Sequence, residues 1–125
     1  MLDGFKVYYL TTGLPTISIT LNGVSFNKTA IVKMEYPEHV LLMINSEEKK
    51  IAIQACDADS PGATPYFRKR KGRDIVSVRW NNRDLLSTIS KIMGWDLKDS
   101  GYRAQGDYLE NENAIVFDLS QATPI

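Results

Sequence analysis

The sequence predicts an α+β fold: a single domain of two strand–helix–hairpin units that close a mostly antiparallel, barrel-like core. Three observations predict it. Residues 16–55 and 75–119 share one order: a short strand, an Asn, a helix with one apolar face, a helix breaker, and two strands around a polar turn. A unit of this size cannot bury its own apolar face, so we expect the two units to share one core. The 125 residues fit one domain, with residues 56–74 as the linker.

The first unit opens with residues 16–21, where apolar and hydroxyl side chains alternate. This period of two is typical of a strand with one buried face. The dipeptide Asn22-Gly23 favours a tight hairpin turn into a return strand. Asn27 can then cap a helix over residues 28–34.

Pro37 cannot continue that helix, and two strands at residues 40–44 and 51–53 follow it around a polar turn. Residues 56–64 are rich in Asp, Ser, Pro and Gly, which indicates the start of a linker without regular structure.

The second unit begins with a strand at residues 75–79 and continues with the strongest helix signal, Arg83 to Met93. Five apolar residues in that helix fall on one broad face. Asn81 or Asn82 is expected to cap it, and Gly94 to end it.

Two strands close this unit, at residues 102–107 and 114–119, around a turn at residues 110–113; the residues after them are expected to fray. The side chains predicted to form the core are Ile17, Ile19, Val24, Phe26, Ile31, Leu42, Ile44, Ile51, Ile53, Val76, Val78, Leu86, Ile89, Ile115 and Phe117.

The charge is balanced overall, with 15 basic and 15 acidic residues, but it is unevenly distributed. Residues 67–91 contain eight Lys or Arg and two Asp, which gives this segment a net charge of +6. A neutral total argues against a general coat on nucleic acid, whereas a local basic segment favours a restricted anionic partner.

No apolar run approaches the roughly 18 residues of a membrane-spanning helix, and the N-terminus lacks the pattern of a secretory signal. The single cysteine, Cys56, excludes an internal disulfide and fits a reducing compartment. We therefore expect no membrane association and a cytoplasmic location.

No catalytic signature is present. The only histidine, His39, has no second histidine or paired cysteine, and Cys56 would depend on it as a base. Residues 57–60 lack the glycine and terminal Glu of a calcium loop, and the acidic residues between 107 and 112 fit a solvated turn. We expect no enzyme, metal or cofactor, and a small enzyme using His39 or Cys56 ranks last.

Residues 17–53 resemble the AbrB-like swapped-hairpin DNA-binding domains, on Gly23-Val24-Ser25-Phe26, the helix 28–34, the interruption 35–37 and the closing strands. Residues 75–119 look like a looser second copy, as in family members with two units in one chain. The family typically has arginine and an Ile-Pro step at the strand-to-helix region, where this chain has Phe26-Asn27-Lys28. The resemblance implies DNA contact, and it is better matched in the second copy, where Arg79 and Arg83 occupy this junction.

These observations predict a non-enzymatic DNA-binding regulator that binds double-stranded DNA and forms a homo-oligomer. A cluster of cations beside aromatic residues can neutralise phosphates and stack on bases. The alternative is a protein-interaction or assembly module whose basic loop docks on an acidic surface. The residues predicted to contact nucleic acid are Arg68, Lys69, Arg70, Lys71 and Arg73 at the phosphates, with Arg79 and Arg83 nearer the bases.

Overall fold

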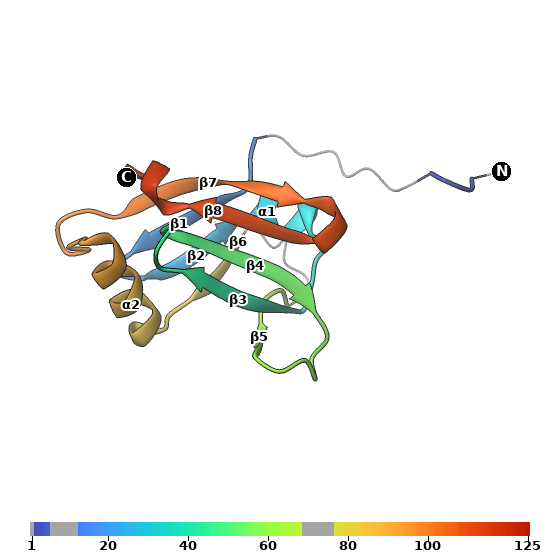
Figure 1. Cartoon of the computed structure of the whole chain (residues 1–125), viewed down its shortest axis with the longest axis horizontal. Helices are drawn as coiled ribbons and strands as arrows, with labels where there is room; N and C mark the ends of the chain where they lie inside the picture. Colours follow the sequence, from blue (N-terminus) through green and yellow to red (C-terminus); the bar gives the residue numbers. More distant parts are fainter. Residues whose placement is uncertain (1, 6–12, 69–76) are drawn as a thin grey trace.

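The computed structural model describes residues 2–5, 13–68 and 77–125. Its described residues form a mostly antiparallel sheet that curls into a half-barrel, together with two α-helices (Figure 1). The strands neighbour one another in the order β5-β3-β4-β8-β7-β1-β2-β6, and β9 pairs with β7.

The first part of the chain contains β1 (Thr16–Thr20), β2 (Gly23–Asn27), α1 (Lys28–Lys33), β3 (His39–Asn45), β4 (Lys50–Cys56) and β5 (Ala63–Pro65). The second part contains β6 (Ser77–Trp80), α2 (Arg83–Met93), β7 (Tyr102–Leu109), β8 (Ala114–Asp118) and β9 (Thr123–Pro124), with short 3-10 helices η1 (Glu110–Glu112) and η2 (Leu119–Gln121).

The strands and helices agree closely with the pattern read from the sequence. The helix predicted at Arg83–Met93 has these bounds, the side chain of Asn82 accepts a hydrogen bond from Leu85 N (2.9 Å), and Gly94 ends the helix in the left-handed conformation (φ 69°). Helix α1 is one residue shorter than predicted. Glu35 (φ 62°) and Tyr36 (φ 57°) turn into the left-handed region before Pro37, which directs the chain away from the helix axis into β3.

Two strands were not predicted. β5 lies in the segment expected to be an irregular linker, and it pairs with the first three residues of β3. The C-terminal residues, expected to fray, form β9, and Ile125 N donates to Gly101 O (2.9 Å). Both strands are too short to show an alternating pattern, and their hydrogen bonds come from partners distant in the sequence.

The core lies on the concave side of the curled sheet. Of the predicted core residues, those that are buried are Ile17, Ile19, Val24, Phe26, Ile31, Ile51, Ile53, Val78, Ile89, Ile115 and Phe117. Buried residues that were not predicted include Met34, Val40, Tyr66, Ala104 and Leu119.

Three of the core predictions differ from the structure and one lies outside the described residues. Ile44 is 39% exposed, so its assignment to the core was wrong, and Leu42 and Leu86 are only half-buried, although both pack against the core. β5 covers only the start of β3, so the far half of β3, including Ile44, extends beyond it. Val76 is not among the described residues.

Asn27 joins three segments of the chain at the start of α1. Its side-chain oxygen accepts from Ala30 N and Thr16 N, both at 3.0 Å, and its amide donates to Leu14 O at 3.0 Å. A helix cap is usually a local device, but this cap also holds the beginning of β1 against the end of β2.

We predict that Asn27→Ala lowers the free energy of unfolding by about 2 kcal/mol, because it removes a cap and the hydrogen bonds to β1. Asn82→Ala is the matched control, since Asn82 caps α2, and it should cost about 1 kcal/mol. Urea denaturation followed by circular dichroism measures both. Equal losses would contradict a role for Asn27 beyond the cap.

Candidate nucleic-acid interface

One row of side chains runs across the convex side of β7, β1, β2 and β6. The strand registers place Arg103 opposite Ser18, Ser18 opposite Ser25, and Ser25 opposite Arg79. Successive side chains in a strand point to opposite faces, so burial of Ile17 and its neighbours turns this row outward. We call these four residues the arginine–serine row.

The arginine–serine row has a guanidinium group at each end and hydroxyl groups between them. Arg79 and Arg103 are exposed, and Arg103 Nε donates to Ser18 Oγ at 3.4 Å. Neighbouring strands lie about 4.8 Å apart, so the backbones of the two arginines are separated by roughly 14 Å. The row contains no carboxylate, so it presents hydrogen-bond donors without a competing negative charge.

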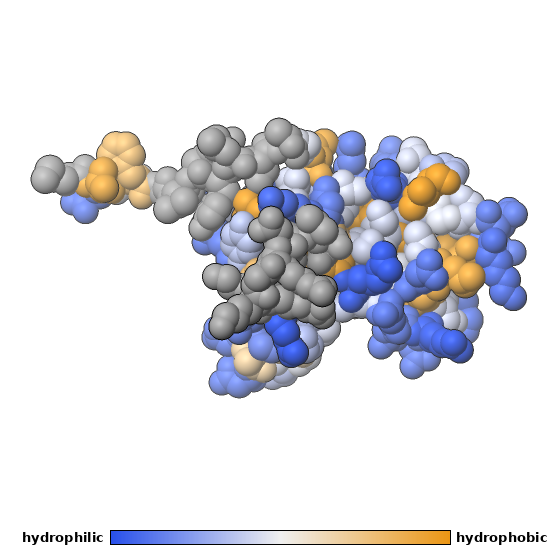
Figure 2. All heavy atoms as spheres, turned by 180° about the vertical axis from the view of Figure 1, so that it is seen from behind, coloured by the Kyte–Doolittle hydropathy of each residue, from blue (hydrophilic) through white to orange (hydrophobic). Residues whose placement is uncertain are grey.

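Figure 2 shows the molecule from the side opposite to that of Figure 1, in which β1, β2 and β6 lie behind β7 and β8. Hydrophilic and weakly polar side chains cover much of the visible surface, and hydrophobic side chains gather toward the end where α2 lies (Figure 2). The arginine–serine row is polar along its whole length, which suits a solvated partner such as a phosphate backbone better than an apolar one.

Arg83 extends this surface past the β1–β2 turn. Arg79 and Arg83 line one hollow of about 400 Å³ together with Asn22 and Asn81. The cap at Asn82 begins α2 directly after β6, which brings the two arginines to the same hollow. Arg79 and Arg83 therefore flank the strand-to-helix junction as the sequence indicated, and their contact with DNA stays a prediction.

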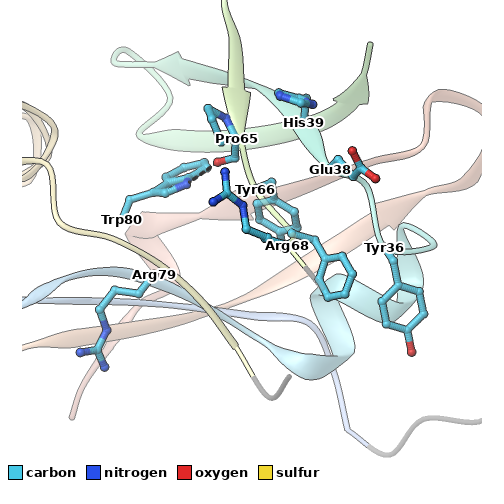
Figure 3. Close-up of a pocket in the computed structure, with 9 residues that line it drawn as sticks. Tyr36, Glu38, His39, Pro65, Tyr66, Arg68, Arg79 and Trp80 are labelled. Carbon is cyan, nitrogen blue, oxygen red and sulfur yellow. Dashed lines mark hydrogen bonds between the residues drawn. The ribbon is translucent and has the colours of Figure 1, made fainter. Parts of the chain in front are cut away.

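Arg68 lies outside the arginine–serine row, on a second hollow that Arg79 also lines. It points toward Trp80 and Pro65, whereas Arg79 points away from both (Figure 3). The other predicted contact residues, Lys69, Arg70, Lys71 and Arg73, lie outside the described residues.

The sequence analysis missed Arg103 and the two serines. The alternation of apolar and polar residues in β1 indicated that Ser18 faces outward, and the alternation in β7 indicates the same for Arg103. No local signal shows that β7 lies beside β1, because these strands are more than 80 residues apart in the chain.

A second hollow, which we call the aromatic pocket, opens between β5 and β6 and has a volume of about 670 Å³ (Figure 3). These two strands are the ends of the strand order. Trp80 Nε1 donates to Pro65 O at 3.0 Å and spans the gap between them. The lining residues are Tyr36, Glu38, His39, Pro65, Tyr66, Phe67, Arg68, Arg79 and Trp80.

Ring contacts shape the walls of the aromatic pocket. The Tyr36 and Phe67 rings meet edge to face with centroids 5.1 Å apart. Trp80 makes similar contacts with Tyr66 (6.1 Å) and with the buried Phe26 (5.1 Å). Edge-to-face contacts are favourable, so they stabilise the orientations of the rings that line the pocket.

The Tyr66 hydroxyl is buried and has no hydrogen-bond partner among the described residues. Burial raises the pKa of this phenol above its ordinary value of 10.0. The group therefore remains neutral at physiological pH and does not supply charge to the aromatic pocket.

His39 and Cys56 face each other across β3 and β4. No hydrogen bond joins their side chains within the part of the chain that the structure describes, and no group of three or more His, Cys, Asp or Glu there is placed to hold a metal ion. The prediction that the protein is not an enzyme remains a prediction.

Comparisons of the chain with protein-family models, with curated proteins and with solved structures find no match. Among the described residues, neither helix has the length and apolar character that crossing a membrane requires.

We predict that Tyr66→Phe leaves the protein as stable as the wild type or stabilises it by up to about 1 kcal/mol, because a buried hydroxyl without a partner is costly. Since the phenol pKa is raised on folding, the unfolded chain ionises first, and wild-type stability falls as the pH rises above 10. Tyr66→Phe should reduce that fall. Part of it will remain, because burial also raises the pKa of Tyr108. Denaturation at pH 8 and 11 measures the difference, and an unchanged slope would contradict this account.

Proposed function

We propose that the protein is a non-enzymatic regulator that binds double-stranded DNA through the arginine–serine row. The observation that carries the proposal is the alignment of Arg79 and Arg103 at the two ends of one outward row, with hydroxyl donors between them. Arginine and serine side chains are common donors to phosphate oxygens. The separation of roughly 14 Å is similar to the width of about 12 Å of the major groove of B-DNA, which would allow contacts to both of its edges.

Arg83 supports the same proposal. It shares a hollow with Arg79, so the positive charge continues from the sheet to the start of α2. The predicted basic segment at residues 69–73 would add further phosphate contacts on the approach to β6, as the charge distribution of the sequence indicates.

We propose that the two strand–helix–hairpin units arose by duplication, in keeping with the resemblance to two-unit AbrB-like proteins. The strand pairing supports this. Let β1, β2, β3 and β4 correspond to β5, β6, β7 and β8, and exchange each strand for its counterpart. The pairs β2–β6 and β4–β8 are then unchanged, β3–β4 becomes β7–β8, and β1–β7 becomes β5–β3, all of which are pairs of the observed sheet.

We predict that Arg103→Glu weakens binding to a random DNA duplex and lowers the slope of log K against log salt by about 0.9, the value of one lost phosphate contact. Fluorescence anisotropy at two salt concentrations measures both quantities. Arg103 lies outside the basic segment of the sequence, and only the pairing of β7 with β1 places it in the row, so its substitution tests the structural argument separately from the charge of that segment.

Lys50→Glu is the matched control for this experiment. It makes the same change of charge on β4, whose neighbours are β3 and β8 and not the strands of the row. Equal effects of the two substitutions would show that net charge, and not the arginine–serine row, controls binding.

A protein-interaction module is the second candidate function. The observation that favours it is an apolar row on another part of the convex surface, where Met43, Ala52 and Val116 are aligned across β3, β4 and β8 and Met43 is 41% exposed. The proposed partner is a second copy of the chain, as the predicted homo-oligomer requires.

For this candidate, we predict that Met43→Lys lowers the oligomeric state measured by sedimentation equilibrium, because a charge would interrupt the apolar row. Duplex binding per chain should be preserved, since Met43 is far from the arginine–serine row in the strand order. An unchanged sedimentation profile would remove this surface as the interface.

A further inference from the structure

The aromatic pocket lies at the point where the two halves of the sheet are paired differently. β1 and β2 form a ladder of four residue pairs. β5 and β6, their counterparts in the exchange described above, are not neighbours in the strand order and are linked by the side chain of Trp80. The space between them is the pocket of about 670 Å³, which is large enough for a small ligand.

We propose that the aromatic pocket binds an unpaired nucleotide, with its base stacked on the aromatic walls and its phosphate at Arg68. The pocket combines exposed ring surfaces with a cation, which is the combination that proteins use for unpaired bases. Tyr36 is 41% exposed, and Phe67 and Trp80 are half-buried, so each presents ring surface to the hollow.

Arg68 supplies the positive charge. It is exposed, and its side chain lies between the Trp80 side of the pocket and the Tyr36 side (Figure 3). Among the described residues the ion pair is that of Lys50 with Glu48, so Arg68 forms no ion pair with a described carboxylate. Its guanidinium group can therefore donate to phosphate oxygens.

Glu38 gives the pocket a means of distinguishing bases. Tyr66 N donates to Glu38 O at 2.8 Å and Phe67 N donates to Pro37 O at 3.1 Å, which continues the pairing of β3 with β5. These bonds hold the backbone of Glu38, which lines the pocket. A carboxylate accepts hydrogen bonds from an exocyclic amino group, such as N4 of cytosine, that thymine lacks. We therefore expect the pocket to prefer cytosine to thymine.

The source of the nucleotide is either a free mononucleotide or an unpaired position in a strand. The second source rests on the proposed function, because it requires that the protein meets nucleic acid. Both sources share the chemistry of a base and a phosphate, so one titration with two probes separates them.

The experiment uses Trp80 as the reporter. The chain has two tryptophans, and Trp95, which is stacked on Tyr102 outside the pocket, is replaced in a Trp95→Phe variant. Trp80 fluorescence is then titrated with dCMP and with a single strand of eight deoxycytidines. Saturable quenching supports the proposal; equal affinity for the two probes identifies a free nucleotide, and at least tenfold tighter binding of the strand identifies strand binding.

Two substitutions in the Trp95→Phe background test the assigned roles. Arg68→Glu should weaken the binding of both probes at least tenfold, and since Arg68 is exposed the fold should be preserved, as circular dichroism can verify. Glu38→Ala should remove the difference between the deoxycytidine strand and a thymidine strand of equal length. Lys50→Glu is the control, because Lys50 lies on β4, outside both the aromatic pocket and the arginine–serine row, and it should leave quenching unchanged.

The proposal is overturned if neither dCMP nor the deoxycytidine strand quenches Trp80 fluorescence at millimolar concentration. It is also overturned if Arg68→Glu leaves the affinity for both probes unchanged. These outcomes are separate from the failure of duplex binding. If neither probe quenches Trp80 fluorescence but the protein binds duplex DNA and this binding depends on Arg103, only the proposed nucleotide site is overturned. If dCMP quenches Trp80 fluorescence but the protein does not bind duplex DNA, the proposed function is overturned and the proposed nucleotide site is supported.

Discussion

The packing of Phe26 holds the two ends of the curled sheet to its middle. This side chain, only 1% exposed, extends from β2 and contacts the rings of Trp80, Tyr66 and Phe117 at centroid distances of 5.1, 5.4 and 5.8 Å. Those rings come from β6, from the residue after β5 and from β8. The aromatic pocket exists because the same contacts bring β5 near β6 without joining their backbones.

The arginine–serine row depends on the same core. Side chains alternate along a strand, so the register that buries Ile17, Phe26 and Val78 also turns their neighbours toward solvent. A slip of one residue would exchange the two sets of side chains of the strand that slips, and in β6 or β7 it would bury the arginine. The polar surface and the apolar core are thus two results of one register, and neither could change without the other.

Features decided by neighbouring residues could be predicted from the sequence, and features decided by distant pairing could not. The caps of both helices and the left-handed Gly94 follow from local hydrogen bonding and backbone geometry. The exposure of Ile44 depends on how far β5 reaches along β3, and the place of Arg103 depends on the pairing of β7 with β1. For the candidate site, Arg79 and Arg83 were predicted through their junction, whereas the rest of the row required the three-dimensional register. The pocket, too, arises from segments that only the fold brings together.

In the described sheet, β5 and β6 are joined by the hydrogen bond from the Trp80 indole to Pro65 O and not by a backbone ladder, so the boundary between them is a line of low mechanical resistance. Elsewhere in the described sheet, separating two neighbouring strands of the main path breaks several backbone hydrogen bonds at once. Among the described residues, the hydrogen bond that joins β5 to β6 is that from the indole, and a bond of this kind contributes about 1 kcal/mol. The ring contacts of Trp80 with Phe26 and Tyr66 supply the rest of the cohesion along this line. A force that opens the half-barrel therefore meets no backbone ladder between the described strands β5 and β6, and its resistance there comes from side chains alone.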